Sequence, residues 1–205
     1  MNDGRARIGE ELNEVEVEGL VHKGVGQTHE QGPRIGTRVT IQVATPWDGE
    51  GLRRMFSCTS SETIYRRFLI PYPDVPEQTL ALMLDVDHHD KESLVAVADE
   101  EIIGHAMYVR LGDGGEAEMA IIVEDGYQSK GVGKLLLRKL AEKARSRGVE
   151  TFVGTVLTEN RRMLDSIGAV FTESGRVIAD GVFHFRAPLR TLKPADPARI
   201  LRRVA

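Results

Sequence analysis

The sequence predicts a single α/β (α+β) domain in which helices flank a mixed β-sheet. Three observations favour this class. Short segments in which every second residue is apolar predict strands, whereas longer segments with apolar residues three or four positions apart predict helices. The two kinds of segment follow one another along most of the chain. With 205 residues, the chain is long enough for one domain with a substantial hydrophobic core.

The first part of the domain is predicted to be a strand followed by helices. The strand covers residues 38–44, where every second residue is apolar. One helix starts near Pro46, because proline is favoured in the first turn, and another starts after Ser60, in a sequence that resembles a capping box. Three prolines end the second helix, and Glu77–Leu84 is a third, short one.

The rest of the domain is predicted to contain a three-strand meander, a long amphipathic helix and a smaller C-terminal part. The helix ends at Gly148, a residue type favoured at helix C-termini. The expected ranges are strands at 94–98, 102–111 and 118–123, a helix at 130–147, a strand at 151–157, a short helix at 160–166, and strands at 169–172 and 177–185.

Three regions of the chain differ in composition. Residues 1–36 contain several glutamates and glycines but no Phe, Trp or Tyr, so this polar segment is predicted to be flexible. A short edge strand at Val15–Val17 is the alternative within it. Residues 37–190 form the predicted folded domain, and residues 191–205 form a basic tail.

The composition argues against several classes of protein. A formal net charge of −4 gives no electrostatic basis for binding nucleic acid or an anionic membrane. The single cysteine, Cys58, permits neither an internal disulfide nor a cysteine-based zinc site, and the six histidines form no HExxH motif. No apolar run approaches the ~18 residues of a membrane helix, and no signal-peptide core is present. We therefore expect a cytoplasmic protein without a metal.

A glycine-rich turn lies between a predicted strand and the long predicted helix. Its sequence is Gln128-Ser-Lys-Gly-Val-Gly133, and such a turn presents backbone N–H groups and the positive end of the helix dipole to an anion. A P-loop would need lysine where Val132 stands, and a dinucleotide fingerprint would need glycine where Leu136 stands. The pattern that remains is Gln-x-x-Gly-x-Gly.

This pattern resembles the acetyl-CoA pyrophosphate loop of the GNAT superfamily of N-acetyltransferases. Val123 ends the preceding strand five residues earlier, and Asn160-Arg-Arg-Met163 with a later glycine and aromatic residue is similar to the superfamily's second cofactor motif. The resemblance covers roughly residues 38–187 and implies a mostly antiparallel sheet with acyl-CoA in a splay between two central strands. The cofactor-binding residues that it implies are Ile121, Ile122, Val123, Gln128, Ser129, Lys130, Gly131, Val132, Gly133, Lys134 and Asn160.

Glu118 is the candidate general base. Amide formation needs a neutral amine, and a lysine amine with a pKa of about 10.4 must first lose a proton near neutral pH. Glu118 lies in an otherwise apolar strand, where a carboxylate is out of pattern. The alternative interpretation is a solvated carboxylate at the strand start. Tyrosine is a common general acid in the superfamily, but no tyrosine follows Asn160, so water or the leaving thiolate takes that role.

Two further stretches are similar to bacterial protein lysine acetyltransferases that modify acyl-CoA synthetases. They are the Glu-x-Ala-x-x-Val stretch that starts at Glu118, and the segment from Ser60 to Phe68. The resemblance implies transfer of an acetyl group from acetyl-CoA to a protein lysine by direct attack in a ternary complex. It also implies that Tyr65, Arg66 and Tyr72 contact the acceptor, and that Arg67 lies in the same segment lining the acceptor cleft. No nucleotide-sensing module of the kind that some of these enzymes carry is evident in the sequence.

Two other functions stay open at this point. The same site could acetylate a small amine such as a polyamine, an amino acid or an antibiotic. The domain could also be a non-catalytic regulatory module that binds acyl-CoA, although Glu118 disfavours this reading. An acidic cleft would favour small cationic acceptors, whereas a shallow and open cleft would favour a protein lysine.

Overall fold

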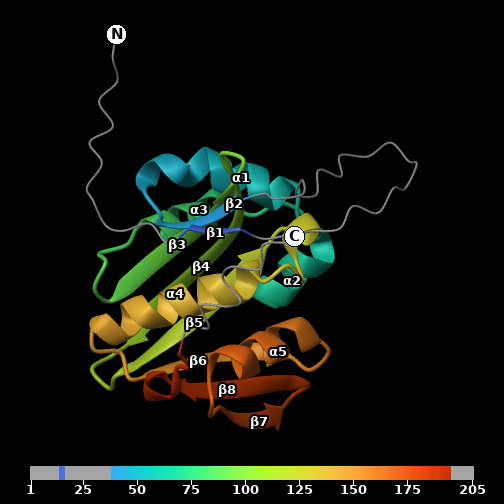
Figure 1. Cartoon of the computed structure of the whole chain (residues 1–205). Helices are drawn as coiled ribbons and strands as arrows, with labels where there is room; N and C mark the ends of the chain where they lie inside the picture. The colour runs from blue at the N-terminus through green and yellow to red at the C-terminus, as the bar shows by residue number, and fades with distance from the viewer. Residues whose placement is uncertain (1–13, 17–37, 195–205) are drawn as a thin grey trace, which may run out of the picture.

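The computed structural model describes residues 14–16 and 38–194, which form an eight-stranded sheet with helices on both faces (Figure 1). The strands lie in the order β1-β2-β3-β4-β5-β6-β8-β7. Every neighbouring pair is antiparallel except β5 and β6, which run parallel. The predicted fold class, a mixed and mostly antiparallel sheet flanked by helices, is confirmed.

Most elements lie where the sequence predicts them. The strands are β1 Glu14–Glu16, β2 Arg38–Val43, β3 Lys91–Ala98, β4 Glu101–Leu111, β5 Glu116–Val123, β6 Thr151–Leu157, β7 Gly175–Ala179 and β8 Val182–Pro188. The helices are α1 Gly49–Ser57, α2 Ser61–Phe68, α3 Glu77–Leu84, α4 Val132–Ser146 and α5 Arg161–Val170, with short 3-10 turns at Pro46–Asp48, Asp125–Tyr127 and Leu189–Thr191.

The two faces of the sheet carry separate hydrophobic clusters. Helices α4 and α5 contribute to one cluster, and α1, α2 and α3 contribute to the other. Figure 1 shows α4 lying across the front of the sheet. Strand β5 belongs to both clusters because its side chains alternate: Met119 and Val123 share the cluster of α4, whereas Ile122 shares that of α1–α3. This alternation decides which β5 side chains can meet ligands on each face.

One predicted strand is wrong. Residues 169 and 170 belong to the last turn of α5, and Phe171 makes only an isolated bridge to Leu192 instead of starting a strand at 169–172. The apolar residues in this stretch continue the helical spacing and are buried in the cluster of α4, so packing extends the helix beyond residue 166. These buried residues are Leu164, Ile167 and Val170.

The segment predicted as one strand at 177–185 is a hairpin. Strands β7 and β8 are joined by Asp180 and Gly181, whose φ angles are 51° and 77°. An Asp-Gly pair with positive φ at both residues is typical of the tight turn that joins two antiparallel strands. The turn signal lies inside a segment that apolar alternation alone assigns to a single strand.

At the opposite edge of the sheet, β1 pairs with β2, with Val15 opposite Val39. This pairing agrees with the alternative of an edge strand within residues 1–36. The other residues of that segment and the tail from residue 195 onward lie outside the described residues, so their predicted flexibility stays a prediction.

Strands β5 and β6 separate part-way along their length. Their pairing joins 116–118 to 151–153, although β5 continues to Val123 and β6 to Leu157. Gly154 is the first β6 residue beyond the pairing, and the Phe185 ring of β8 lies against it. A Cβ atom at Gly154 would lie 2.7 Å from this ring. The gap between the two strands has the position of the predicted splay.

We expect Gly154→Ala to destabilise the fold by about 1–3 kcal/mol, because the added methyl group would overlap the buried Phe185 ring. The carbonyl oxygen of Met119, 3.2 Å from the same position, prevents a shift in the other direction. Thermal or denaturant unfolding measures the effect. Gly114→Ala is the control, since a Cβ there meets nothing within 4 Å. Equal stability of the two variants would contradict the prediction.

Candidate active site

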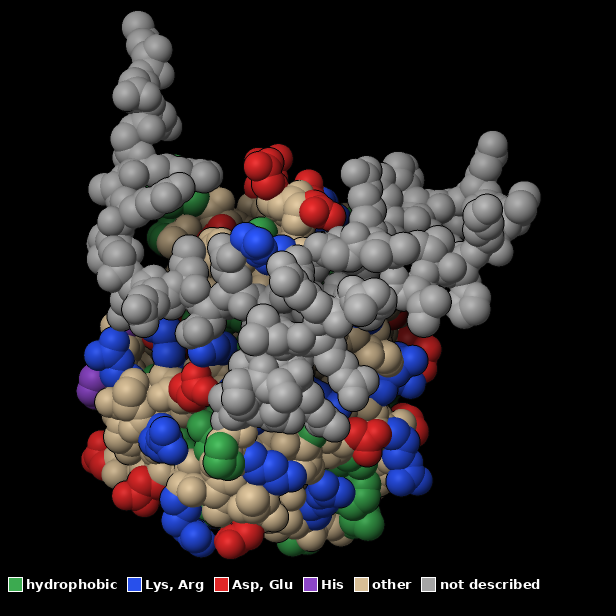
Figure 2. Space-filling model, in the orientation of Figure 1, with side chains coloured by type: hydrophobic (Ala, Val, Ile, Leu, Met, Phe, Trp, Pro, Cys, Tyr) green, Lys and Arg blue, Asp and Glu red, His purple; other side chains and the backbone are tan. Residues whose placement is uncertain are grey.

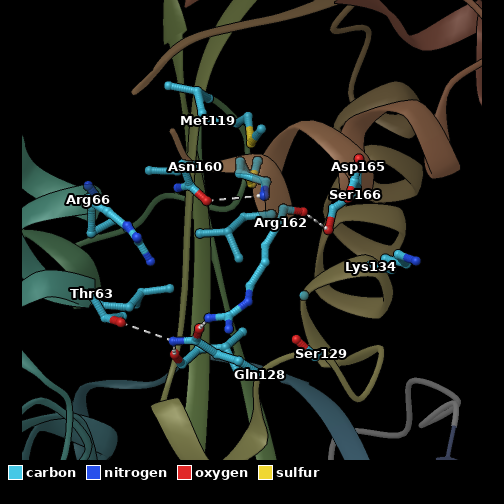
Figure 3. Close-up of a pocket in the computed structure, with 18 of the residues that line it drawn as sticks. Thr63, Arg66, Met119, Gln128, Ser129, Lys134, Asn160, Arg162, Asp165 and Ser166 are labelled. Atoms are coloured by element: carbon cyan, nitrogen blue, oxygen red, sulfur yellow. Dashed lines mark hydrogen bonds between the residues drawn. The ribbon is translucent and has the colours of Figure 1, made fainter. Parts of the chain in front are cut away.

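A cavity of about 340 Å³ opens in the gap between β5 and β6. Its walls come from both strands beyond their last pair, from the loop before α4 and the start of α4, and from one side each of α2 and α5 (Figure 3). The part of β5 that pairs with β6 ends at Glu118, and the glycine-rich loop follows Val123. About 17 Å of extended strand separates these two positions, at ~3.4 Å per residue. A ligand that reaches both ends must therefore be long and narrow.

The first turn of α4 is a site for an anion. The first hydrogen bond within the helix runs from Leu135 N–H to Gly131 O at 3.0 Å, so the N–H groups of residues 132–134 precede it. No side chain caps this end of the helix among the described residues. Gly131 adopts a φ of 93° and Ser129 a φ of 61°, so the loop turns sharply and leaves the helix start open to the cavity. Unpaired N–H groups and the helix dipole favour a phosphate here.

Glycine suits positions 131 and 133 of the loop for different reasons. Gly131 needs its positive φ, which residues with a Cβ rarely adopt. Gly133 has an ordinary helical backbone, and a Cβ there would only touch a Val123 methyl group at 3.8 Å. Packing does not require glycine at 133, so the open space in front of it fits a ligand that approaches the backbone closely. The pyrophosphate of acyl-CoA has the charge and shape for this cradle.

The Gln128 side chain connects three walls of the cavity. Its Nε2 donates to the Val123 carbonyl at 2.9 Å and to Thr63 Oγ1 of α2 at 3.1 Å. Its Oε1 accepts a 2.6 Å hydrogen bond from Arg162 of α5. Figure 3 shows Arg162 extending from α5 across the cavity to reach Gln128. Gln128 therefore holds the loop in place, and Arg162 adds a cation beside the phosphate cradle.

Asp125 fixes α2 against the same loop. Its carboxylate accepts hydrogen bonds from Ser60 N at 2.7 Å, Ser60 Oγ at 2.9 Å and Thr63 Oγ1 at 2.8 Å. Burial opposes its ionisation, but these hydrogen bonds outweigh burial and lower the pKa of Asp125. The predicted cap at Ser60 is present, since Ser60 Oγ also accepts from Thr63 N. Asp125 thus decides which side of α2 faces the cavity.

Strand β5 offers free backbone groups to the gap. Glu124 N–H donates to Ile103 O of β4, and in an antiparallel pair the hydrogen-bonding direction alternates along the strand. The backbone groups of residues 121 and 123 therefore point away from β4 and toward β6. Beyond residue 118 there is no β6 partner for them within the described sheet. Only the Val123 carbonyl is taken, by Gln128, so N–H donors remain for a ligand in the gap.

Glu118 lies where the two strands part. It is the last β5 residue paired with β6, opposite Val153, and its side chain is exposed. Alternation puts it on the same face as Ala120 and Ile122, which is the face covered by α1–α3. Glu118 is thus beside the inner end of the cavity and remote from the phosphate cradle, although it is not part of the cavity wall itself.

Arg67 of α2 lies on the same side of the sheet as Glu118. Its side chain lines the cavity and rests on the Phe68 ring, with the guanidinium carbon 4.8 Å from the ring centre. Burial lowers the pKa of Arg67 to about 10, and the negative charge of Glu118 opposes this shift. Arg67 is therefore still a cation at neutral pH.

His105 lies beneath this site in β4, opposite Ile122, and is fully buried. Its Nε2 lies 2.8 Å from Ser93 Oγ, and its Nδ1 has no hydrogen-bond partner among the described residues. Burial, reinforced by the charge of Arg67, lowers the pKa of His105 to about 3. The imidazole is neutral in the working range and serves as a structural residue.

The comparison with protein families agrees with this geometry. The model described as Acetyltransferase (GNAT) family matches residues 56–166, just over half of the chain. The chain belongs to the GNAT acetyltransferase family. The prediction of an N-acetyltransferase is confirmed at this level.

Individual relatives of this GNAT chain include Acetyltransferase Pat of Mycolicibacterium smegmatis, which is 38% identical over 121 residues, 55% of this chain and 35% of that protein. The crystal structure of the GNAT domain of S. lividans PAT has a TM-score of 0.69 at 31% identity and covers 75% of this chain and 92% of that one. YncA, a putative acetyltransferase of Salmonella typhimurium solved with acetyl-CoA, has a TM-score of 0.58 at 19% identity, covers 74% and 94%, and shares the fold. The chain thus spans about a third of the M. smegmatis protein.

The GNAT cavity brings together most of the predicted cofactor residues. Those in its wall are Ile121, Ile122, Val123, Gln128, Ser129, Gly131, Gly133, Lys134 and Asn160. Val132, the first residue of α4, is instead buried in the hydrophobic cluster between this helix and the sheet. Lys130 is turned away from the wall, with its ammonium group donating to Gly126 O at 2.6 Å and lying 5.8 Å from the Tyr127 ring centre.

The predicted acceptor residues divide in a similar way. Arg66 lines the GNAT cavity and forms a 2.5 Å ion pair with Glu62. Tyr65 is 41% exposed and lies outside the cavity wall. Tyr72 packs edge-on against Phe68 at 5.1 Å, which makes it part of the packing of α2. Tyr65 and Arg66 are neighbours on α2 and differ because of the rotation of this helix about its axis, which the hydrogen bonds of Asp125 fix. Tyr72 lies beyond the end of the helix.

Sequence reasoning missed three wall residues that matter for chemistry: Thr63 of α2, Arg162 of α5 and Phe185 of β8. Arg162 lies inside the second cofactor motif, and its place in that motif could have indicated its role. The other two depend on how distant segments pack, which local spacing does not reveal. Arg67, which the resemblance placed in the acceptor segment, does line the cavity.

Asn160 caps α5 and faces the GNAT cavity. Its Oδ1 accepts from Met163 N at 3.2 Å, which leaves the side-chain NH₂ group for a ligand. We expect Asn160→Ala to raise the KM for acetyl-CoA more than the KM for the acceptor, because the residue lies beside β6 on the cofactor route. Asn160→Ser keeps a capping oxygen and controls for lost helix stability. A larger effect on the acceptor KM would mean that Asn160 contacts the acceptor.

The described residues include no helix that is both long and apolar enough to cross a membrane. Within the same residues, no group of three or more His, Cys, Asp or Glu side chains is arranged to hold a metal ion. On the face seen in Figure 2, acidic and basic side chains are interspersed.

Proposed function

We propose that this GNAT chain transfers an acetyl group from acetyl-CoA to the amine of a protein lysine, with Glu118 as general base. One observation carries the proposal: the only parallel pair of strands in the described sheet parts directly after Glu118. A carboxylate therefore lies beside one end of a cavity whose other end is an uncapped helix N-terminus.

Different residues would act at the two ends of the cavity. Acetyl-CoA would supply the activated thioester. Residues 131–134 and Arg162 would hold its phosphates, and the free N–H groups of Ile121 and Val123 would donate to the arm in the gap. A backbone N–H at the inner end would also stabilise negative charge on the attacked carbonyl oxygen.

Glu118 would accept the proton of the attacking amine. Its exposure allows an acceptor to approach from the α1–α3 side, and water can relay the proton where direct contact is not made. No side chain of the chain is assigned as general acid, so the leaving thiolate takes a proton from water. Attack in a ternary complex needs no covalent enzyme intermediate, which agrees with the position of Cys58 outside the cavity wall.

A protein lysine is favoured as acceptor by the likeness to two proteins named Pat or PAT. The 31% identity to the S. lividans GNAT domain extends over 92% of that domain. We further propose an acyl-CoA synthetase as the acceptor protein and the cytoplasm as the site of action. The cationic Arg67, which lines the cavity near Glu118, argues against a small polycationic acceptor, whereas the charge of Arg66 is already neutralised by Glu62.

The test is an acceptor survey with the full chain. The protein is incubated with acetyl-CoA and either its own cell's proteome, a purified acyl-CoA synthetase, or small amines (polyamines, amino acids and aminoglycosides). Acetyl-lysine is read by mass spectrometry and CoA release by thiol titration. Lysine acetylation that depends on Glu118 supports the proposal. Acetylation of small amines alone would establish the small-molecule alternative, and CoA binding without transfer to any acceptor would establish a binding module.

A further inference from the structure

The guanidinium of Arg67 forms no ion pair and no hydrogen bond within the described part of the chain, although it rests on the Phe68 ring. Its Nε atom is buried without an acceptor, and neither an ion pair nor a hydrogen bond reaches its other nitrogens. The neighbouring Arg66 is different, since Glu62 already neutralises it. A buried donor without an acceptor is unfavourable, and more so when it is charged. An acceptor that arrives with a ligand would remove this cost.

Arg67 belongs to the acyl end of the cavity and not to its phosphate end. Thr63 of the same helix contacts Gln128 at the loop, and four residues of α helix carry Arg67 about 6 Å farther along the helix axis. The negative charge of Glu118 acts on Arg67, and the positive charge of Arg67 acts in turn on the buried, neutral His105, which lies opposite Ile122. Arg67 is thus beside the part of β5 between Glu118 and Ile122.

There is room beneath this guanidinium. Ala120, whose side chain lies on the same face between Glu118 and Ile122, lines the cavity with a single methyl group. Glu118 is exposed to water and forms no ion pair with Arg67, so it does not saturate the donors of the guanidinium. Arginine binds a carboxylate through two parallel hydrogen bonds, and such pairs are strongest where water is excluded.

We propose that Arg67 binds the terminal carboxylate of a dicarboxylic acyl group, so that the cavity accepts CoA thioesters such as succinyl-CoA or malonyl-CoA as well as acetyl-CoA. This inference rests on the proposed acyl-CoA function of the same cavity. The donor is favoured over the acceptor as the source of the carboxylate because Arg67 lines the same cavity as the cofactor loop, whereas Tyr65 and Tyr72 of the acceptor side do not.

The transfer itself follows the same course as for acetyl. The amine nitrogen attacks the thioester carbon, a C–N bond forms, and the C–S bond breaks with its electron pair left on sulfur. The amine proton goes to Glu118 and then to solvent, and the CoA thiolate is protonated by water. The distal carboxylate takes no part in bond making, and the modified lysine changes from a cation to a group that carries a negative charge.

Binding of matched donors tests the proposal without any acceptor. Titration calorimetry compares succinyl-CoA with its terminal amide, succinamoyl-CoA, whose acyl group has the same shape but no negative charge. We expect the wild-type chain to bind succinyl-CoA at least tenfold more tightly than the amide. Arg67→Met should abolish this ratio, and Arg67→Lys, which keeps the charge but not the two parallel donors, should retain part of it. Acetyl-CoA is measured with every variant as the reference for cofactor binding.

Arg176→Met is the matched control, because Arg176 is an exposed arginine of β7 that does not line the cavity. It should leave the ratio unchanged. The proposal is overturned if the wild type does not distinguish the two donors, or if Arg67→Met distinguishes them equally well. If Arg67→Met fails to fold, the affinity ratio of the wild type and its reduction in Arg67→Lys still test the proposal. If the chain binds acetyl-CoA but does not distinguish succinyl-CoA from its amide, only this inference is overturned. If the chain binds none of these CoA esters, the proposed function is overturned as well.

Discussion

Replacing Gly133 by aspartate should weaken acetyl-CoA binding at least tenfold, which corresponds to about 1.4 kcal/mol. The backbone of Gly133 is helical and its missing Cβ faces open space beside Val123, so the new side chain can be built without a clash within the protein. It would enter the space in front of the α4 N-terminus and place a negative charge where the pyrophosphate should lie. Calorimetry on the purified chain measures the loss.

The stability of the same variant separates a lost ligand contact from a damaged fold. An acidic residue in the first turn interacts favourably with the helix dipole, so Gly133→Asp should melt at or above the wild-type temperature. Gly114→Asp adds the same charge at a turn where a Cβ meets nothing within 4 Å, and it should bind acetyl-CoA normally. Unchanged affinity in a folded Gly133→Asp chain would remove the assignment of this loop to the cofactor.

The cofactor half of the site could be predicted from sequence because its chemistry is local. The strand end at Val123, the loop at Gln128 and the helix start at Val132 are consecutive in the chain, so spacing alone describes their geometry. The capping residue Ser60 and the cofactor-facing Asn160 could be found for the same reason. Each depends on residues within one turn of itself.

The acceptor half could not be predicted in this way. Tyr65, Arg66 and Arg67 are consecutive on α2, and only the docking of that helix decides which of them faces the cavity. Asp125, more than fifty residues later, fixes this docking through Ser60 and Thr63. Sequence patterns for a helix report which face is apolar, but Arg67 is a charged residue on an inward face. Tertiary packing therefore overrides the ordinary expectation that arginine is solvated.

Glu118→Gln should lower kcat at neutral pH by about 10²–10⁴-fold while acetyl-CoA binding holds, because general-base catalysis contributes on that scale. Glutamine preserves the size of the side chain and the pairing of β5 but cannot accept the amine proton. Glu116→Gln is the matched control: Glu116 lies two residues earlier on the same face of β5, where it is ion-paired with Arg186. The control should change kcat by less than about twofold.

The pH dependence distinguishes loss of a base from loss of structure. As pH rises toward the amine pKa of about 10.4, more of the acceptor is already neutral, so the deficit of Glu118→Gln should shrink. A distorted strand would give a deficit that does not depend on pH. Lost cofactor binding would mean that Glu118 supports β5, and a solvated surface carboxylate would give nearly wild-type rates at every pH. Wild-type kcat for Glu118→Gln on a verified acceptor, measured where chemistry limits the rate, would end the assignment of Glu118 as base.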